Sequence, residues 1–255
     1  MMLTAITRAV SPSIHRCELS FRDRRPIDLP LAEAQHRRYE ACLEELGVSV
    51  ISLPAEPELP DAVFVEDPAI VLDEVAVITR PGAASRRPEA ASLAKVLERY
   101  RPLRWIAEPG TLEGGDVMRA DRTLFVGTSA RSNAAGIEQL AGLLRPFGYD
   151  VKAAGLRGCL HLKSACTYLG AGRVLVNREW ADSAALADYE LVDVAPDEPE
   201  AANVLVIGDS AIVAACFPAT AAILERLGFR VKLLDNSELM KAEAGMTCSS
   251  LIFTA

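Results

Sequence analysis

The chain has 255 residues, of which half are apolar and 24% are charged, and its formal net charge is −8. This composition is typical of a globular protein with a sizeable core, and the length allows one large domain or two small ones. Nucleic acids and anionic membranes select basic surfaces, so we expect neither as a partner. An acidic site would instead favour a cationic ligand.

The N-terminus and the cysteines point to the cytoplasm. Residues 1–16 lack the apolar core of a signal peptide, and no run approaches the roughly 18 apolar residues of a membrane span. The six cysteines are scattered without a CxxC pair: Cys17, Cys42, Cys159, Cys166, Cys216 and Cys248. That pattern is typical of neither a disulfide framework nor a zinc site, and it suits a reducing, cytoplasmic location.

The first predicted element is a strand over residues 3–10. Residues 16–34 are polar and contain proline, which indicates a long surface loop able to serve as a lid. A helix and a strand over 46–54 follow. The helix is predicted from apolar residues spaced at i, i+3, i+4 and i+7: Tyr39, Cys42, Leu43 and Leu46.

Four segments then repeat one plan, which begins near Val63, Thr111, Cys159 and Ala201. Each has a polar start, an apolar strand, a turn, a second strand, a helix and a closing strand, and the third has a shortened helix. The helical spacing recurs in the first two units, at Leu93, Val96, Leu97 and Tyr100 and at Leu140, Leu143, Leu144 and Phe147. Gly148 and Gly228 are predicted left-handed caps at helix C-termini.

The C-terminal residues CSSLIFTA predict a strand that belongs to a fifth unit, whose remainder is the N-terminal segment. Segment 232–247, before this strand, breaks the repeat. A chain that completes its last repeat with its first segment implies a ring of five ββαβ units. We therefore expect an α/β fold, a five-bladed pseudosymmetric propeller, in a single catalytic domain over residues 1–255. A generic α/β fold with coincidental similarity between its segments is the alternative.

A ring predicts one site, because the start of the first strand in every unit should approach the central axis. The residues at these positions carry acidic, imidazole, amide and thiol groups: Glu66, Asp67, Glu113, Asp116, His161, Asn203 and Cys248. Such a cluster on strands rich in Val, Leu and Ile is difficult to explain by packing alone.

Each of these residues also has a structural interpretation. A free cysteine is often a small core residue, but Cys248 follows Gly245-Met246-Thr247 and precedes two serines, and its register with His161 favours a nucleophile. A histidine on an apolar strand is often only a core residue, unless a carboxylate such as Glu113 fixes its tautomer. Asp61, with Glu66 and Asp67, lies on a strand that otherwise resembles core, so these carboxylates meet a cation or form a salt-bridged strand end.

Seven motifs follow one another over nearly the whole chain: PDAVFVEDPAIV, ITRPGAASRR, TLEGGDV, FVGTSARSNAAG, LHLKSA, AAN and GMTCSS. With these motifs in this order the chain resembles dimethylarginine dimethylaminohydrolases, members of the pentein superfamily of guanidino-group-modifying enzymes. The family fold is a five-fold pseudosymmetric propeller, which agrees with the ring expected from the repeats.

The resemblance implies a role for each matching position. Cys248 would be the nucleophile, His161 the general acid and base, and Glu113 its partner. The substrate would be held by seven residues: Asp67 and Glu66 at the guanidinium, Arg86 and Arg131 at the α-carboxylate, and Asp61, Leu19 and Ala242 at the α-amino group. A larger hydrophobic residue is commoner in the family at the position of Ala242.

The expected reaction is hydrolysis of Nω-methylated arginines to citrulline and methylamine or dimethylamine, through a covalent thiouronium on Cys248. It needs no metal and no cofactor, although a Cys/His pair could bind zinc as an inhibitor. The partner is a small guanidino amino acid, and the protein is a monomer or a homodimer. Two alternatives stay open: an arginine deiminase that releases ammonia, and a non-catalytic propeller that serves as a binding protein.

Overall fold

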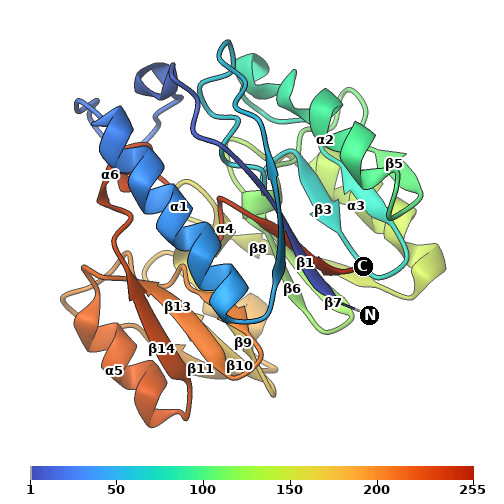
Figure 1. The fold of residues 1–255 in the computed structure, drawn as a ribbon. Coiled ribbons are helices and arrows are strands. Elements are labelled where there is room, and N and C mark those ends of the chain that lie inside the picture. The colour runs from blue at the N-terminus through green and yellow to red at the C-terminus, as the bar shows by residue number, and fades with distance from the viewer. Residues whose placement is uncertain (1) are drawn as a thin grey trace.

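The computed structural model describes residues 2–255, and its strands form five sheets of three strands each. Figure 1 shows the small sheets arranged side by side, with the longer helices at the periphery. In every sheet the first strand is antiparallel to the second, and the third is parallel to the second. This order matches the repeat predicted from the sequence.

The five sheets have the following strands. They are β15 (Leu251–Thr254), β1 (Leu3–Arg8) and β2 (Ser49–Leu53); β3 (Ala69–Val71), β4 (Ala76–Ile78) and β5 (Leu103–Trp105); β6 (Val117–Ala120), β7 (Thr123–Thr128) and β8 (Asp150–Gly155); β9 (Cys166–Gly170), β10 (Arg173–Val176) and β11 (Glu190–Asp193); and β12 (Leu205–Ile207), β13 (Ser210–Ala214) and β14 (Arg230–Leu234).

A helix joins the second strand of each sheet to the third, because parallel neighbours need a crossover connection. These helices are α1 (Leu29–Glu45), α2 (Glu89–Leu97), α3 (Ala134–Leu144), α5 (Pro218–Arg226) and, in the unit predicted to have a shortened helix, the 3₁₀ turn η5 (Ser183–Leu186). The remaining helices are short: η1 (Ile14–Arg16), η2 (Ala84–Arg86), η3 (Gly114–Asp116), η4 (Arg145–Phe147), α4 (Leu162–Ala165) and α6 (Ser237–Met240). The predicted caps Gly148 and Gly228 have φ of 75° and 95°.

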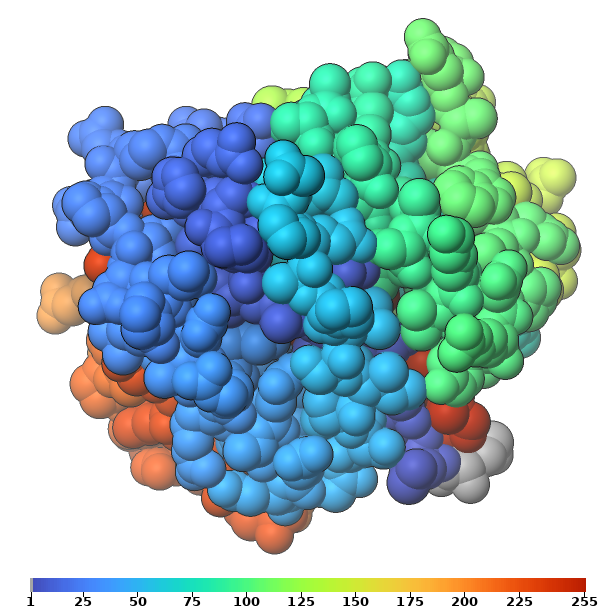
Figure 2. All heavy atoms as spheres, turned by 45° about the horizontal axis from the view of Figure 1, so that its top comes forward, coloured from blue at the N-terminus to red at the C-terminus, as the bar shows by residue number. Residues whose placement is uncertain are grey.

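The two ends of the chain share one sheet. β1 pairs antiparallel with β15, from Leu3 opposite Thr254 to Ile6 opposite Leu251, so the termini lie close together in Figure 1. The prediction that the C-terminus supplies the first strand of a unit whose remainder is the N-terminal segment is confirmed. Figure 2 shows the N-terminal part of the chain, in blue, packed beside the green segments around α2.

The apolar core links neighbouring sheets. Five clusters of buried side chains each contain residues of two units, as these pairs illustrate: Leu72 with Val126, Phe125 with Val176, Leu175 with Val213, Ile212 with Ala5, and Leu251 with Ile78. A sixth cluster packs the N-terminal segment onto the residues around Phe64 and Leu239. Every unit is therefore held by apolar contacts on two sides.

Two expected boundaries differ from the structure. Helix α1 begins at Leu29, so the predicted lid loop (16–34) ends there. The side chain of Asp28 caps this helix by accepting a hydrogen bond from Leu31 N (3.1 Å), which is the reason for the early start. Segment 232–247 is also partly regular, since it contains the end of β14 and all of α6.

The acidic segment before β3 is a chain of turns rather than the predicted strand. Its amides bond locally or to the distant C-terminal segment: Phe64 N donates to Asp61 O (2.9 Å), and Glu66 N donates to Cys248 O (3.2 Å). These amides are consequently unavailable to a sheet partner.

Candidate active site

The predicted central residues gather in the segments that precede the first strand of each sheet, and not on the strands themselves. Asp67 precedes β3, Glu113 precedes η3, His161 caps α4, and Cys248 precedes β15. Backbone hydrogen bonds link these segments, since Gly114 N donates to Asp67 O (2.8 Å). The sequence predicted the convergence correctly and the local conformation wrongly, because the backbone amides bond within local turns or to acceptors in other units.

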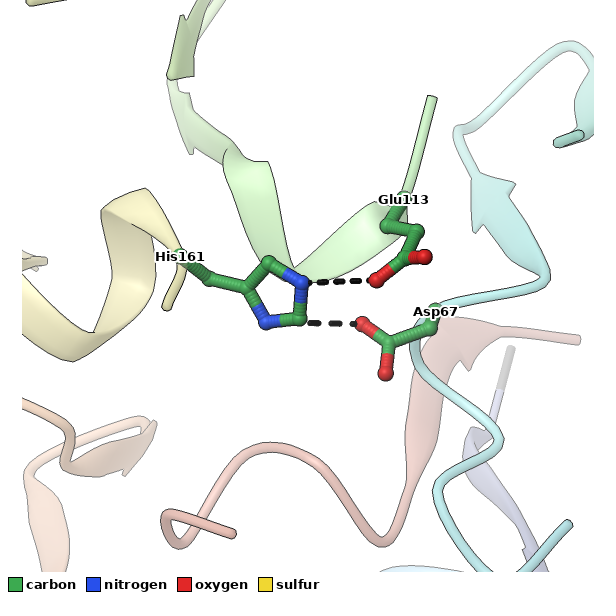
Figure 3. A group of neighbouring side chains, drawn as sticks. All are labelled: Asp67, Glu113 and His161. Atoms are coloured by element: carbon green, nitrogen blue, oxygen red, sulfur yellow. Dashed lines mark hydrogen bonds and ion pairs between the residues drawn. The ribbon is translucent and has the colours of Figure 1, made fainter. Parts of the chain in front are cut away.

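His161 and Glu113 form a buried pair. His161 Nε2 lies 2.8 Å from Glu113 Oε2, and Nδ1 lies 3.9 Å from Asp67 Oδ1. Glu113 is fully buried and His161 is 5% exposed. Figure 3 shows the imidazole edge facing both carboxylates. The predicted partnership of Glu113 with His161 is therefore present in the geometry.

This pairing changes the pKa values of both groups. Burial by itself lowers the pKa of His161, but the charge of Asp67 and the hydrogen bond to Glu113 outweigh it and raise the pKa to about 9. Burial alone raises the pKa of Glu113, whereas the hydrogen bond and charge of His161 bring it down to about 2. At neutral pH the pair is consequently an imidazolium and a carboxylate.

Cys248 is half-buried, and its Sγ accepts a hydrogen bond from Gly245 N (3.3 Å). Desolvation, reinforced by the negative charges of Glu66 and Asp67, raises the pKa of the thiol to about 12. Within residues 2–255 no hydrogen bond joins Cys248 to His161, although both line one cavity. The group is therefore a thiol near an imidazolium.

One small cavity collects most of the predicted site residues. Seven of the ten line it: Asp61, Asp67, Arg86, Arg131, His161, Ala242 and Cys248. Glu113 lies behind His161 and holds it. Leu19 and Glu66 lie outside the lining.

Arg86 is the most heavily bonded cation of the site. Its Nη1 lies 2.6 Å from Asp67 Oδ2, and its Nε and Nη2 donate to the carboxylate of Glu89 (3.1 and 2.9 Å). Glu89 is 3% exposed and was not predicted as a site residue. Its position at i+3 from Arg86, in the first turn of α2, is the sequence signal that could have indicated it.

Arg131 makes fewer contacts. It lies 3.4 Å from Glu113 Oε1, and it donates to Ser20 Oγ (3.1 Å) in the predicted lid. Arg86 Nη1 is 4.0 Å from Glu113 Oε2. The two arginines thus approach Glu113 through its two oxygens and face the same cavity.

Glu66 is bound away from the cavity. Its carboxylate accepts hydrogen bonds from Lys163 and from Thr247 Oγ1 (2.8 Å). Asn203 bonds to Thr247 through both its amide oxygen and its nitrogen (3.0 and 3.1 Å). The structure thus places Glu66 and Asn203 around the turn that carries Cys248, and Lys163 is a residue of this network that the sequence reasoning missed.

Asp116 holds the backbone of the site and does not line the cavity. It accepts hydrogen bonds from Ser129 Oγ and Ser132 Oγ (2.6 Å each) and from Leu162 N (3.0 Å). It is fully buried. The last bond ties the second unit to the residue that follows His161, so Asp116 acts on the site by holding that backbone.

The predicted lid lies over the cavity. Glu243 has φ of 63°, and its carboxylate accepts the backbone N–H groups of Ser20, Phe21 and Arg22 (2.9, 2.6 and 2.7 Å). Asp61 accepts from Glu18 N (3.1 Å). Glu18 rather than Leu19 lines the cavity, while the neighbouring Leu19 packs into the apolar cluster beneath the lid.

Asp67, Glu113 and His161 each place one potential metal-ligand atom within 4.8 Å of the others. These atoms already have partners, since Asp67 Oδ1 accepts from Gly115 N (3.0 Å) and His161 Nε2 pairs with Glu113. A cation there would have to displace these contacts. From residue 2 onward, the chain has no helix with the length and apolarity that a membrane span requires.

Residues 17–179 match a family model described as N,N dimethylarginine dimethylhydrolase, eukaryotic. The chain is 38% identical to N(G),N(G)-dimethylarginine dimethylaminohydrolase of Streptomyces coelicolor, over 97% of this chain and 95% of that protein. It is 35% identical to the protein of that name from Pseudomonas aeruginosa, over 89% and 90% of the two. The structure superposes with a TM-score of 0.94 on a cysteine-to-serine mutant of the Pseudomonas aeruginosa enzyme complexed with citrulline, at 32% identity over 99% of this chain and 100% of that one. The resemblance seen in the sequence motifs is confirmed, and the chain belongs to the dimethylarginine dimethylaminohydrolase family of enzymes that act on the guanidino group.

Proposed function

We propose that the protein hydrolyses Nω-methylated arginines, dimethylarginine and monomethylarginine, to citrulline and the corresponding amine. The observation that carries the proposal is the buried His161–Glu113 pair on a cavity that also presents Cys248, Asp67 and Arg131. A thiol, an imidazolium, a carboxylate and a guanidinium are the groups that such a reaction needs.

The substrate's two ends match the two sides of this cavity. Asp67 supplies a carboxylate for the planar guanidinium, and Arg131 has donors left for the α-carboxylate. Asp61 and the backbone around Ala242 lie under the lid, where they would receive the α-amino group. We assign Leu19 to the same end through its backbone, beside Glu18. Glu66 would act on the guanidinium indirectly, through the field that it adds near Cys248.

Substrate binding also favours ionisation of the Cys248 thiol. Burial and the charges of Glu66 and Asp67 hold the pKa of Cys248 at about 12, so few molecules carry a thiolate near neutral pH. A guanidinium beside Asp67 offsets those negative charges and favours the thiolate. The nucleophile therefore forms where its target is bound.

The proton transfers follow from the charge state of His161. The thiol proton passes to solvent, the thiolate attacks the guanidinium carbon to form a tetrahedral adduct, and the imidazolium donates its proton to the departing amine. A thiouronium on Cys248 results. The neutral imidazole then takes a proton from water, whose oxygen attacks the same carbon, and collapse releases citrulline and the thiol. No step requires a metal or a cofactor.

We further propose that residues 1–255 form one catalytic domain, a closed five-bladed propeller. Support comes from the shared β15–β1 sheet and from the five clusters that link each unit to the next and the last to the first. All six cysteines are free thiols, which supports the predicted cytoplasmic location. The partner is a small guanidino amino acid, and the protein is a monomer or a homodimer.

The test is citrulline release from asymmetric dimethylarginine, monomethylarginine and arginine, by wild type and by Cys248→Ser. We expect turnover of the methylated substrates to exceed that of arginine, and to fall by about 10³-fold or more in the variant. Faster release of ammonia from arginine would make the protein a deiminase. Absence of turnover with all three would favour the non-catalytic alternative.

A further inference from the structure

The guanidinium of Arg86 is itself a ligand of the substrate-binding carboxylate. Arg86 is 4% exposed, and Nη1 lies 2.6 Å from Asp67 Oδ2. Asp67 is the carboxylate to which the proposed function assigns the substrate's guanidinium. An arginine of the chain therefore pairs with a carboxylate that the substrate needs, through the same chemical group.

Most of the N–H groups of Arg86 already have partners in this position. Nε and Nη2 are bonded to both oxygens of Glu89, and Nη2 also approaches the carbonyl oxygens of Asp61 and Phe64 (3.4 Å each). The Nη1 group lies between Asp67 and Glu113, and Arg86 lines the cavity. Nη1 has two N–H groups, so a substrate carboxylate that takes both of them displaces Asp67.

Arg131 differs in this respect. It touches Glu113 and Ser20 but makes no contact within 4.0 Å with Asp67 in the part of the chain that the structure describes. It lines the same cavity and carries the same charge. Arg131 is therefore a matched control for any effect that comes from charge alone.

We propose that Arg86 is a specificity-determining residue that blocks Asp67 until a carboxylate of the ligand draws its Nη1 edge away. The inference rests on the proposed function. Glu89 is the positioning residue that retains the guanidinium through Nε and Nη2 during the exchange. A guanidine or amidine that also has a carboxylate binds Asp67 with its cation and Arg86 with its carboxylate, so Arg86 exchanges one partner for another. A guanidine or amidine without a carboxylate removes Asp67 from Arg86 and offers no replacement, and it therefore binds poorly.

The first experiment uses the wild-type protein and the alkylation of Cys248. The probe is 2-chloroacetamidine, a cation without a carboxylate, and the reference is 2-chloroacetamide, its neutral counterpart. In both reactions the thiol proton passes to the buffer, a sulfur–carbon bond forms, and the carbon–chlorine bond breaks with release of chloride. The ratio of the two rate constants, measured by intact-protein mass spectrometry, reports access to Asp67 independently of thiol reactivity.

L-Alanine supplies the carboxylate without the guanidinium. We expect saturating alanine to raise the amidine-to-amide ratio about tenfold, the effect of removing one close competing charge pair. An unchanged or lower ratio would overturn the proposal. Because no turnover is required, failure of the proposed function would appear separately, as absence of citrulline release by the wild type.

Variants give a second measurement. Arg86→Met is expected to raise the same ratio about tenfold without alanine, and to abolish the response to alanine. Arg131→Met removes an equal charge from the cavity but no contact with Asp67, so we expect it to raise the ratio several-fold less than Arg86→Met does. An equal rise in both variants would show a charge effect only and would contradict the proposal.

Arg86→Met leaves the Glu89 carboxylate buried without its partner, which threatens folding. The double variant Arg86→Met, Glu89→Met removes both charges and is expected to show the same rise in the ratio. Circular dichroism establishes that each variant is folded. A folded double variant with the wild-type ratio would overturn the proposal.

Discussion

Nε2 of His161 lies 2.8 Å from Oε2 of Glu113, in a contact that excludes solvent from both groups. The two residues belong to neighbouring units and are 48 positions apart in the chain. Their ion pair keeps His161 protonated at neutral pH. This state suits a residue whose first task is to donate a proton to the leaving amine.

Glu113→Gln tests this relationship. The amide removes the negative charge but keeps the shape, so we expect the pKa of His161 to fall from about 9 toward its ordinary value. We expect kcat to fall by about 10²–10³-fold, as for loss of an oriented acid–base group. NMR titration of the His161 ring measures the first effect and citrulline release the second.

Glu108→Gln is the control, because Glu108 is a largely exposed carboxylate of the same region, paired only with Arg80. In this variant the pKa of His161 should equal that of the wild type. A Glu113→Gln protein with an unshifted His161 would show that Asp67 and Asp116 alone maintain the raised pKa.

The pKa shifts of His161 and Glu113 predict that the free energy of unfolding depends on pH. His161 has a raised folded-state pKa, so its contribution is complete below about pH 6.5 and is lost as the pH rises through about 9. Glu113 has a depressed pKa, so its contribution is complete above about pH 4.5 and is lost as the pH falls through about 2. The pair therefore stabilises most between these limits, about pH 4.5 to 6.5.

Thermal unfolding of wild type and His161→Gln across pH 5–10 checks this. The Tm difference in favour of the wild type should be largest near pH 5–6 and should shrink by several degrees, roughly 5 °C, by pH 10. A difference that stays constant over this range would mean that His161 stabilises by packing rather than by its charge.

Gly115 is predicted to be essential for a steric reason. A Cβ at this position would lie 2.5 Å from His161 Nδ1 and 2.7 Å from Asp67 Oδ1. Gly115→Ala therefore has to displace one of these side chains, and we expect kcat/KM to fall by about 10²-fold or more. The loss should appear mainly in kcat, since His161 acts in the chemical steps.

Gly142→Ala is the matched substitution. Gly142 lies in α3, and its added Cβ would have no atom within 4 Å among those described. Alanine should stabilise the helix by about 0.5–1 kcal/mol and leave kcat/KM unchanged. Equal activity of the two alanine variants would contradict the steric account of Gly115.

The contacts of Glu243 predict that its carboxylate holds the lid in place. Its carboxylate receives three backbone N–H groups from Ser20, Phe21 and Arg22, and the lid also carries Ser20 Oγ to Arg131. Glu243→Ala removes these acceptors, so we expect hydrogen exchange of residues 20–22 to accelerate and kcat/KM to fall by about tenfold.

The control for Glu243 is Glu225→Ala, an exposed carboxylate of α5. Its variant should match the wild type in both measurements. Unchanged exchange in the Glu243 variant would show that the apolar contacts of Leu19 and Ile27, rather than the carboxylate, hold the lid.

The repeat could be recognised in the sequence because its signals are local. Helical spacing at Leu93 and Leu97, and at Leu140 and Leu144, depends on a period of 3.6 residues, and all four side chains are buried as expected. The left-handed caps at Gly148 and Gly228 are local as well. Equivalent positions in repeated units then placed Cys248, His161 and Glu113 in one region.

The contacts within the site could not be predicted from the sequence. The partners of Arg86, the bond of Glu66 to Lys163 and the carboxylate of Glu243 in the lid connect segments that local patterns do not relate. Even the near neighbour Glu89 matters only because the side chain of Arg86 is buried beside it. The acidic segment 61–68 resembles a core strand in the sequence because of its apolar residues. In the structure its backbone amides bond to carbonyl oxygens within local turns and to Cys248 O.

The sequence by itself determined the units, their order and the chemical groups that face the centre, since these depend on residue types at regular intervals. Tertiary structure alone decided which charge pairs with which. Buried ion pairs form between whichever groups packing brings within about 4 Å, and an error of one residue or one rotamer exchanges the partners. That choice leaves Arg86 on Asp67, His161 protonated and the Cys248 thiol uncharged near neutral pH.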